Sequence, residues 1–155
     1  MTPDGISTED WDKVMELAAN IANAACADDQ ILFSKHVEEL LSYLETLQVK
    51  YGDLPSILAT RADYVEDISE RLALLQRAYT IAQQHGDNIN LTSIASSLTQ
   101  LYIDELRDSV NGAHWLSVLK ACLTKYPNEG EMAELNRLTQ HLLALLGHGT
   151  ADETI

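Results

Sequence analysis

The chain has 155 residues, enough for one domain with its own hydrophobic core. Hydrophobic residues make up 46% of it and charged residues 22%, a balance typical of globular rather than disordered chains. The formal net charge of −14 repels phosphate groups, which argues against nucleic acids and anionic membrane surfaces as partners.

The same composition gives expectations about the compartment. Residues 1–12 are polar and acidic, which is unlike a secretory signal peptide, and no apolar run approaches the ~20 residues of a membrane span. Cys26 and Cys122 are far apart and lie among apolar helical residues, so we expect buried free thiols, with a disulfide as the alternative. A cytoplasmic protein is therefore expected.

Apolar residues recur every three or four positions along almost the whole chain, which predicts an all-α fold. We expect one domain spanning residues 1–155, with flexible tails at 1–6 and 148–155. About seven helices are expected, at residues 8–26, 30–50, 55–64, 68–84, 88–106, 113–125 and 129–146. Asn111-Gly112 is interpreted as a turn between two helices, and Gly147 as the end of the last one.

Short polar residues mark where these helices begin. Ser7 or Thr8 is expected to cap the first helix, because a hydroxyl can accept a hydrogen bond from a free backbone N–H. By the same reasoning, Asn88 or Asn90 is expected to cap the fifth.

An internal repeat accompanies the helical pattern. Tyr51-Gly52-Asp53 and His85-Gly86-Asp87 stand 34 positions apart, each after a helix of similar pattern. That period, and the apolar residues around the second copy, resemble the tetratricopeptide repeat family; the residues concerned are Leu72, Leu75, Ala78, Tyr79, Ala82, Leu98, Thr99, Tyr102, Val118 and Ala121. The resemblance implies antiparallel helix pairs in a right-handed array, with the last helix as a C-terminal cap.

The chain carries no motif that indicates chemistry. None of its five histidines stands at a metal-binding spacing from another ligand, and it has no nucleophile elbow, phosphate-binding loop or dinucleotide fingerprint. We therefore expect no enzyme activity, no metal site and no cofactor.

Carboxylates are the most informative side chains. One cluster falls where the third and fourth helices join, and another at the end of the fifth helix, where acids oppose the helix dipole. Tyr64 and Arg61 lie beside the first cluster and are of types enriched in interface hot spots. The predicted partner-binding residues are Arg61, Asp63, Tyr64, Glu66, Asp67, Glu70, Asp104, Glu105 and Asp108. The alternative is that these acids form a solvated surface that only keeps the protein soluble.

Two functions are consistent with these features. Small size, acidity and the lack of chemistry suggest a bacterial immunity or antitoxin protein, monomeric or dimeric, which blocks a basic toxin domain. The alternative is an adaptor or chaperone of the tetratricopeptide type that holds a peptide segment of a partner protein.

Overall fold

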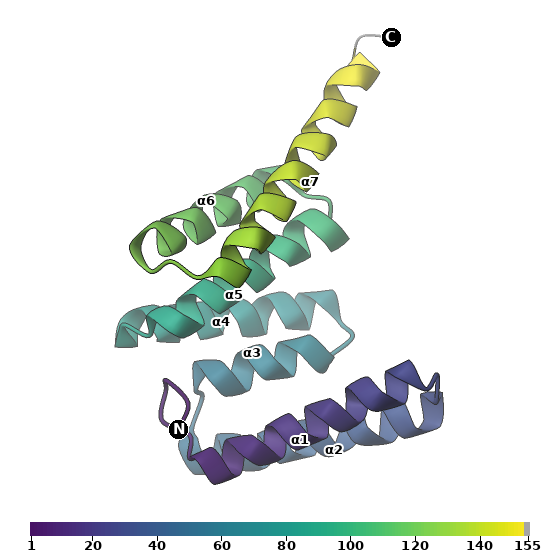
Figure 1. Ribbon diagram of the computed structural model, residues 1–155, viewed down its shortest axis with the longest axis vertical. Helices are drawn as coiled ribbons and strands as arrows, with labels where there is room; N and C mark the ends of the chain where they lie inside the picture. The colour runs from purple at the N-terminus through teal and green to yellow at the C-terminus, as the bar shows by residue number, and fades with distance from the viewer. Residues whose placement is uncertain (154–155) are drawn as a thin grey trace. The chain divides into compact units, whose positions relative to one another are not determined.

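In the computed structural model, residues 1–153 are described, with side chains for residues 1–147. The described chain contains seven α-helices and one π-helical segment and no β-strand, which confirms the all-α prediction (Figure 1). No described helix combines the length and apolar character that crossing a bilayer requires. The helices are α1 (Thr8–Cys26), α2 (Gln30–Tyr51), α3 (Pro55–Tyr64), α4 (Ile68–His85), α5 (Asn88–Gln100), the π-helix η1 (Leu101–Glu105), α6 (Ser109–Lys125) and α7 (Glu129–Glu153).

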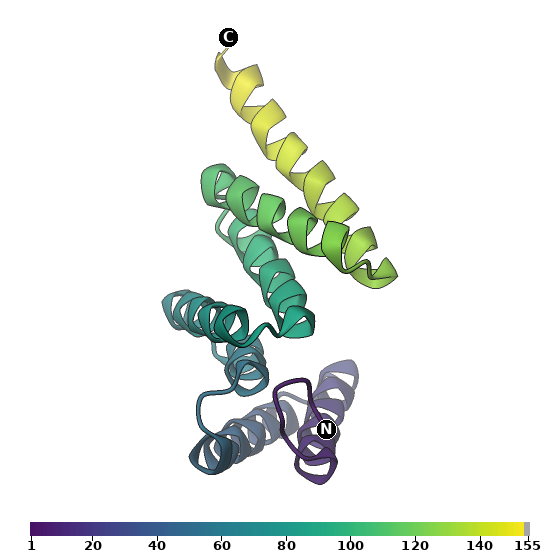
Figure 2. The same ribbon diagram turned by 90° about the vertical axis from the view of Figure 1, so that its left-hand side faces the viewer.

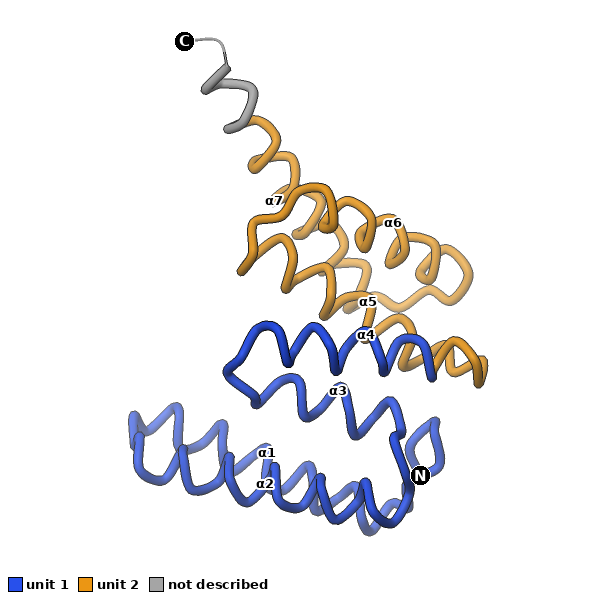
Figure 3. Tube along the Cα trace, turned by 180° about the vertical axis from the view of Figure 1, so that it is seen from behind, with its two compact units in different colours: residues 1–81 blue, residues 82–155 orange. Residues whose placement is uncertain are grey.

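The chain divides into two compact units, Met1–Ile81 and Ala82–Ile155 (Figure 3). The boundary falls inside α4, so the first unit holds α1 to α3 and most of α4, and the second holds α5 to α7. The expectation of one domain over 155 residues remains a prediction.

In the first unit, α1 and α2 lie side by side (Figures 1 and 2). Each of the two helices buries one apolar stripe. Leu40 and Leu44 of α2 are completely buried. Burying a leucine side chain removes apolar surface from water and contributes roughly 1.5–3 kcal/mol. The buried members of this core are Ile6, Val14, Leu17, Ile21, Leu40, Leu44, Leu47 and Ile57.

The N-terminal segment belongs to this core, although the sequence suggested a flexible tail. Ile6 is 0% exposed. Asp4 accepts hydrogen bonds from the Ser56 N–H at 2.7 Å and the Ser56 hydroxyl at 2.8 Å. Because α3 has no side-chain cap of its own, Asp4 satisfies a backbone donor at the start of that helix from across the fold.

Asp10 joins the beginning of α1 to the end of α2. Its Oδ2 accepts hydrogen bonds from Lys50 Nζ at 2.7 Å and from the Tyr51 hydroxyl at 2.6 Å. These two bonds hold the pKa of Asp10 at about 2, below its ordinary value of 3.8. Ser7 caps α1 as predicted, by accepting a hydrogen bond from the Asp10 N–H.

In the second unit, α5 contacts α6 and α7 and leads directly into η1 (Figure 2). Asp87 is the residue that caps α5, by accepting from the Asn90 N–H, so the prediction of Asn88 or Asn90 is wrong. In η1, the Leu106 N–H donates to the Leu101 carbonyl at 3.0 Å, five residues back rather than four.

The turn between η1 and α6 comes earlier than the sequence suggested. Arg107 adopts a left-handed conformation with φ of 52°, and Asp108 then caps α6. Asn111 and Gly112 consequently lie inside α6, and their interpretation as a turn is wrong. A Cβ on Gly112 would lie 2.7 Å from Ile103 Cγ1, so the glycine serves close packing between α6 and η1.

The last helix also differs from its prediction. α7 continues through Gly147 to Glu153, so Gly147 does not end it. Of the flexible tail expected at 148–155, residues 154–155 lie outside the described residues. Both cysteines are free, as expected, but Cys26 is exposed rather than buried.

Candidate functional site

The first predicted cluster of acids surrounds the loop between α3 and α4. α3 ends at Tyr64, Val65 is extended, and α4 starts at Ile68. Asp67 has a local structural role, because its Oδ1 accepts from the Ser69 N–H at 2.8 Å at the start of α4. Glu66 and Glu70 are exposed, and no ion pair is found for either carboxylate within the described residues.

A groove with a volume of about 500 Å³ lies between this loop and the beginning of α2. Its apolar lining includes Phe33, Val37 and Tyr64, each partly buried against the core of the first unit. The remaining lining residues are Ser34, Glu38, Asp63, Val65, Glu66 and Arg71. We call these nine residues the acidic groove.

Asp63 is the acid most influenced by the groove. Its side chain remains exposed at the rim, yet the neighbouring protein atoms partly desolvate it. This desolvation raises the pKa of the Asp63 carboxyl above its ordinary value, and the nearby Arg71 charge opposes that rise. Desolvation also raises the pKa of the adjacent Tyr64 phenol. A carboxylate in this position is incompletely hydrated and would interact favourably with an added cation.

The two arginines near the cluster have different surroundings. Arg61 points to α2, where it donates to Gln48 Oε1 at 3.2 Å and lies 3.6 Å from Glu45, and it does not line the groove. Arg71 does line the groove, and its Nε donates to the Ala62 carbonyl at 3.1 Å. The groove therefore contains three carboxylates and one guanidinium.

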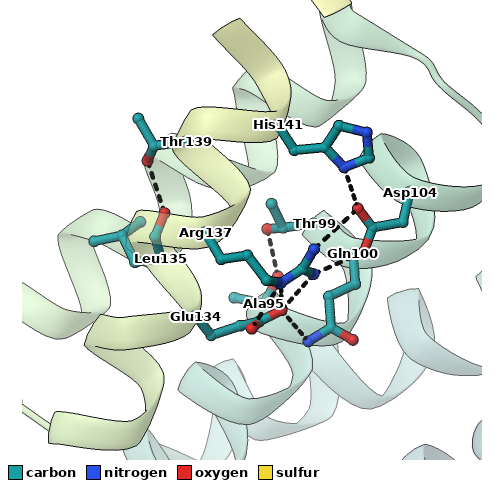
Figure 4. A network of polar contacts seen from close by, with 9 residues as sticks. All are labelled: Ala95, Thr99, Gln100, Asp104, Glu134, Leu135, Arg137, Thr139 and His141. Atoms are coloured by element: carbon teal, nitrogen blue, oxygen red, sulfur yellow. Dashed lines mark hydrogen bonds and ion pairs between the residues drawn. The ribbon is translucent and has the colours of Figure 1, made fainter. Parts of the chain in front are cut away.

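The second predicted cluster lies in the other unit, where Asp104 takes part in an internal polar network (Figure 4). Arg137 of α7 donates to Asp104 Oδ2 at 2.7 Å and to Glu134 Oε1 at 2.6 Å. His141 Nδ1 lies 2.5 Å from Asp104 Oδ1, and Gln100 donates to Glu134 at 2.9 Å. The network joins η1 and the end of α5 to α7.

The electrostatics of this network agree with a structural role. Burial pushes the pKa of Asp104 upward, but the hydrogen bonds from Arg137 and His141 outweigh burial and keep the pKa below its ordinary value. Hydrogen bonding to Arg137 also lowers the pKa of Glu134. The ionised carboxylates are thus the forms that the folded unit stabilises.

Asp108 also has a structural role, as the cap of α6. It accepts from the Asn111 N–H at 3.0 Å and from the Asn111 side-chain amide at 2.7 Å. The expectation that these acids oppose local stability is therefore wrong for Asp104 and Asp108, because α7 supplies partners to Asp104 and α6 supplies Asn111 to Asp108. Glu105 is exposed at the end of η1.

Comparison of the chain with protein families, characterised proteins and solved structures finds no match.

Phe33, Val37 and Glu38 were not among the predicted site residues. In the second helix, the four-residue spacing of Phe33 and Val37 is typical of ordinary core positions, and Glu38 lies on a neighbouring face. Only the pairing of the start of α2 with the end of α3 shows that their outer edges line a groove. The apolar spacing within α2 does not show that these residues also line a groove.

Among the described residues, no group of three or more His, Cys, Asp or Glu side chains is arranged to hold a metal ion. His141 contacts Asp104 rather than a set of potential metal ligands. Partial burial raises the pKa of Cys122 and disfavours its reactive thiolate.

Proposed function

We propose that this chain is an acidic protein-binding module that recognises a basic partner protein through the acidic groove. The supporting observation is a contrast between acids. Glu66 and Glu70 have no ion-pair partner among the described residues and Asp63 is exposed at the groove rim, whereas Asp104 and Asp108 are held by neighbouring side chains. Carboxylates that are already exposed can meet a partner cation without first breaking an internal contact.

The distribution of basic residues supports the same proposal. Most described lysines and arginines are engaged locally: Lys35, Lys50, Arg61, Arg77 and Arg137 pair with acids, and Lys13 and Lys125 lie over tyrosine rings. The net charge of −14 therefore leaves a surface whose remaining charges are mainly negative. Such a surface speeds encounter with a cationic protein, and the effect weakens as salt rises.

Within this class, we propose a bacterial immunity or antitoxin protein that blocks a basic toxin domain. Acidic side chains can occupy the part of a nuclease that holds phosphate, so blocking is electrostatic and steric and requires no chemistry from this chain. The helices would be stacked as antiparallel pairs in a right-handed tetratricopeptide-like array. In the alternative, the same array binds a peptide segment of a partner as an adaptor, and the apolar lining of the groove favours that possibility.

The proposal is tested with the double substitution Asp63→Asn and Glu66→Gln, which removes charge and preserves shape. Captured partners from the source cell are compared at low and high salt, and any basic protein found is expressed alone to test for growth arrest. We expect co-expression of the wild-type chain to restore growth and the double variant to fail. The matched control is Asp12→Asn with Glu16→Gln, two exposed acids of α1 that do not line the groove. Equal capture and protection by both variants would overturn the proposal.

A further inference from the structure

The acidic groove combines a carboxylate rim with an apolar floor, and this combination restricts what it can bind. Phe33, Val37 and Tyr64 pack on the core with their inner edges and line the groove with their outer edges. Glu38, Asp63 and Glu66 stand along the same groove. A role in solubility would explain the acids, but it would not explain the aromatic and aliphatic side chains that line the groove beside them.

We infer that the acidic groove binds a segment of the partner protein in which an arginine stands next to a large apolar side chain. The apolar side chain packs against Phe33 and Val37, and the guanidinium lies between the Asp63 and Glu66 carboxylates beside the Tyr64 ring. This inference rests on the proposed function and specifies the chemistry of its partner.

Arginine fits this position better than lysine for a geometric reason. The planar guanidinium can donate two parallel hydrogen bonds to one carboxylate and can stack on an aromatic face, whereas an ammonium is a more strongly hydrated point charge. Tyr64 is half-buried and adjacent to Asp63, so an aromatic ring and a carboxylate are presented together. With Arg71 included, the lining still has three carboxylates to one guanidinium, a net negative charge that attracts a partner cation.

A second copy of this chain is a poorer occupant. It would bring the same net charge of −14 to an already acidic surface, and like charges facing one another oppose association. Self-association through the groove is therefore an outcome that the experiment can detect, and it would contradict the inference.

The test uses the purified full chain, labelled with ¹⁵N, and four short peptides of equal length. The peptides combine Leu with Arg, Leu with Lys, Ala with Arg, or Leu with Glu. We expect the Leu/Arg peptide to shift the backbone amides of residues 33–38 and 63–66 and to bind most tightly. The Leu/Lys and Ala/Arg peptides should each bind about tenfold more weakly, since each lacks one of the two contributions. The Leu/Glu peptide should not bind.

Two substitutions in α2, each with a matched control in the same helix, locate the binding. Ser34→Lys places a cation in the groove and should weaken Leu/Arg binding about tenfold, whereas Ser42→Lys, at an exposed serine outside this groove, should not. Val37→Thr keeps the shape of the side chain but adds a hydroxyl to the floor, and should weaken binding. Val49→Thr, at a valine that is 90% exposed, is its control. The amide spectra of the free variants check that the fold is retained.

The outcomes separate this inference from the proposed function. Equal binding of all three cationic peptides, shifts outside the groove, or self-association without peptide would overturn the inference. Even if the peptide experiment overturns the inference, loss of partner capture by the Asp63→Asn and Glu66→Gln double variant would support the proposed function. If the Leu/Arg peptide binds as expected but the double variant still captures and neutralises a basic partner, the proposed function is wrong and the peptide specificity of the groove stands.

Discussion

At the scale of single residues, the same side-chain type has three different roles in this chain. Asp10 is an ion-pair acceptor between two helices, Asp67 caps a helix, and Asp63 stands at the rim of a groove. The difference comes from the donors that the fold brings to each carboxylate. An acidic residue is therefore a candidate for binding only after its internal partners have been identified.

Asp10 gives a prediction about pH. Its pKa of about 2 in the folded chain lies below the ordinary 3.8, so the folded state binds this proton less readily than the unfolded state does. The stabilisation is fully present above about pH 4 and is lost as pH falls towards 2. We therefore expect Asp10→Asn to lower Tm near neutral pH and the difference from wild type to shrink progressively below pH 4. Thermal melts followed by circular dichroism across this range measure it.

The control for this experiment is Asp12→Asn, an exposed acid of the same helix that has no partner among the described residues. It should change Tm little at any of these pH values. A Tm difference for Asp10→Asn that stays constant down to pH 2 would contradict the assignment of the Lys50 and Tyr51 hydrogen bonds.

At the scale of elements, the π-helix η1 decides how the second unit is built. Asp104 of this π-helix pairs with Arg137 and His141 of α7. Arg107, two residues after the end of η1, is left-handed. The next helix, α6, then begins at Ser109 and packs against Ile103 through Gly112. π-helical segments are uncommon and are retained where their geometry serves a contact or a site, and here it serves a contact between elements.

Gly112→Ala is predicted to destabilise this unit. In an exposed helical position the same change would stabilise by about 1 kcal/mol, because alanine has the higher helix propensity. Here the new methyl would lie 2.7 Å from a buried Ile103 side chain, so overpacking of about 1–3 kcal/mol outweighs the propensity gain. Urea unfolding of the two proteins measures the difference in the free energy of unfolding.

A second substitution identifies the cause. In the double variant Gly112→Ala with Ile103→Ala, the γ carbon that the new methyl would meet is gone, so the two effects should be less than additive. A Gly112→Ala protein that is more stable than wild type would show that α6 and η1 are not in close contact.

At the scale of the whole molecule, the dominant physical feature is the net charge of −14. Mutual repulsion among the acids opposes the compact state, while most of the described basic residues are paired locally. Each surface ion pair contributes only about 0–1 kcal/mol to stability. Salt that screens every charge should therefore relieve more repulsion among the acids than it removes ion-pair stabilisation. We therefore expect the net charge to lower the stability of the folded chain.

This balance predicts that moderate sodium chloride raises Tm. The expected sign is the opposite of that for a protein stabilised mainly by surface ion pairs. Melting curves at increasing salt measure it, and a variant in which Glu66 and Glu70 are replaced by Gln should respond less. A Tm that falls steadily with salt would show that the ion pairs outweigh the repulsion.

The helices could be predicted well because each is specified by residues close together in sequence. The apolar spacing in residues 8–26, 30–50 and 55–64 agrees with α1, α2 and α3 to within a residue. Two of the errors came at Asn111-Gly112 and Gly147, where glycine was interpreted as a helix end. Gly112 is instead required by a neighbour nine residues away, and a local pattern does not contain that information.

The sequence by itself determined that this chain is helical, strongly acidic and without a recognisable catalytic motif, because periodicity, charge and spacing are local properties. Only the tertiary structure decided which acids remain exposed. Asp104 is paired by residues of α7 more than 30 positions away, and the floor beside Asp63 and Glu66 comes from α2. Ion pairing and grooves depend on distances between elements, and those distances are fixed by packing rather than by position along the chain.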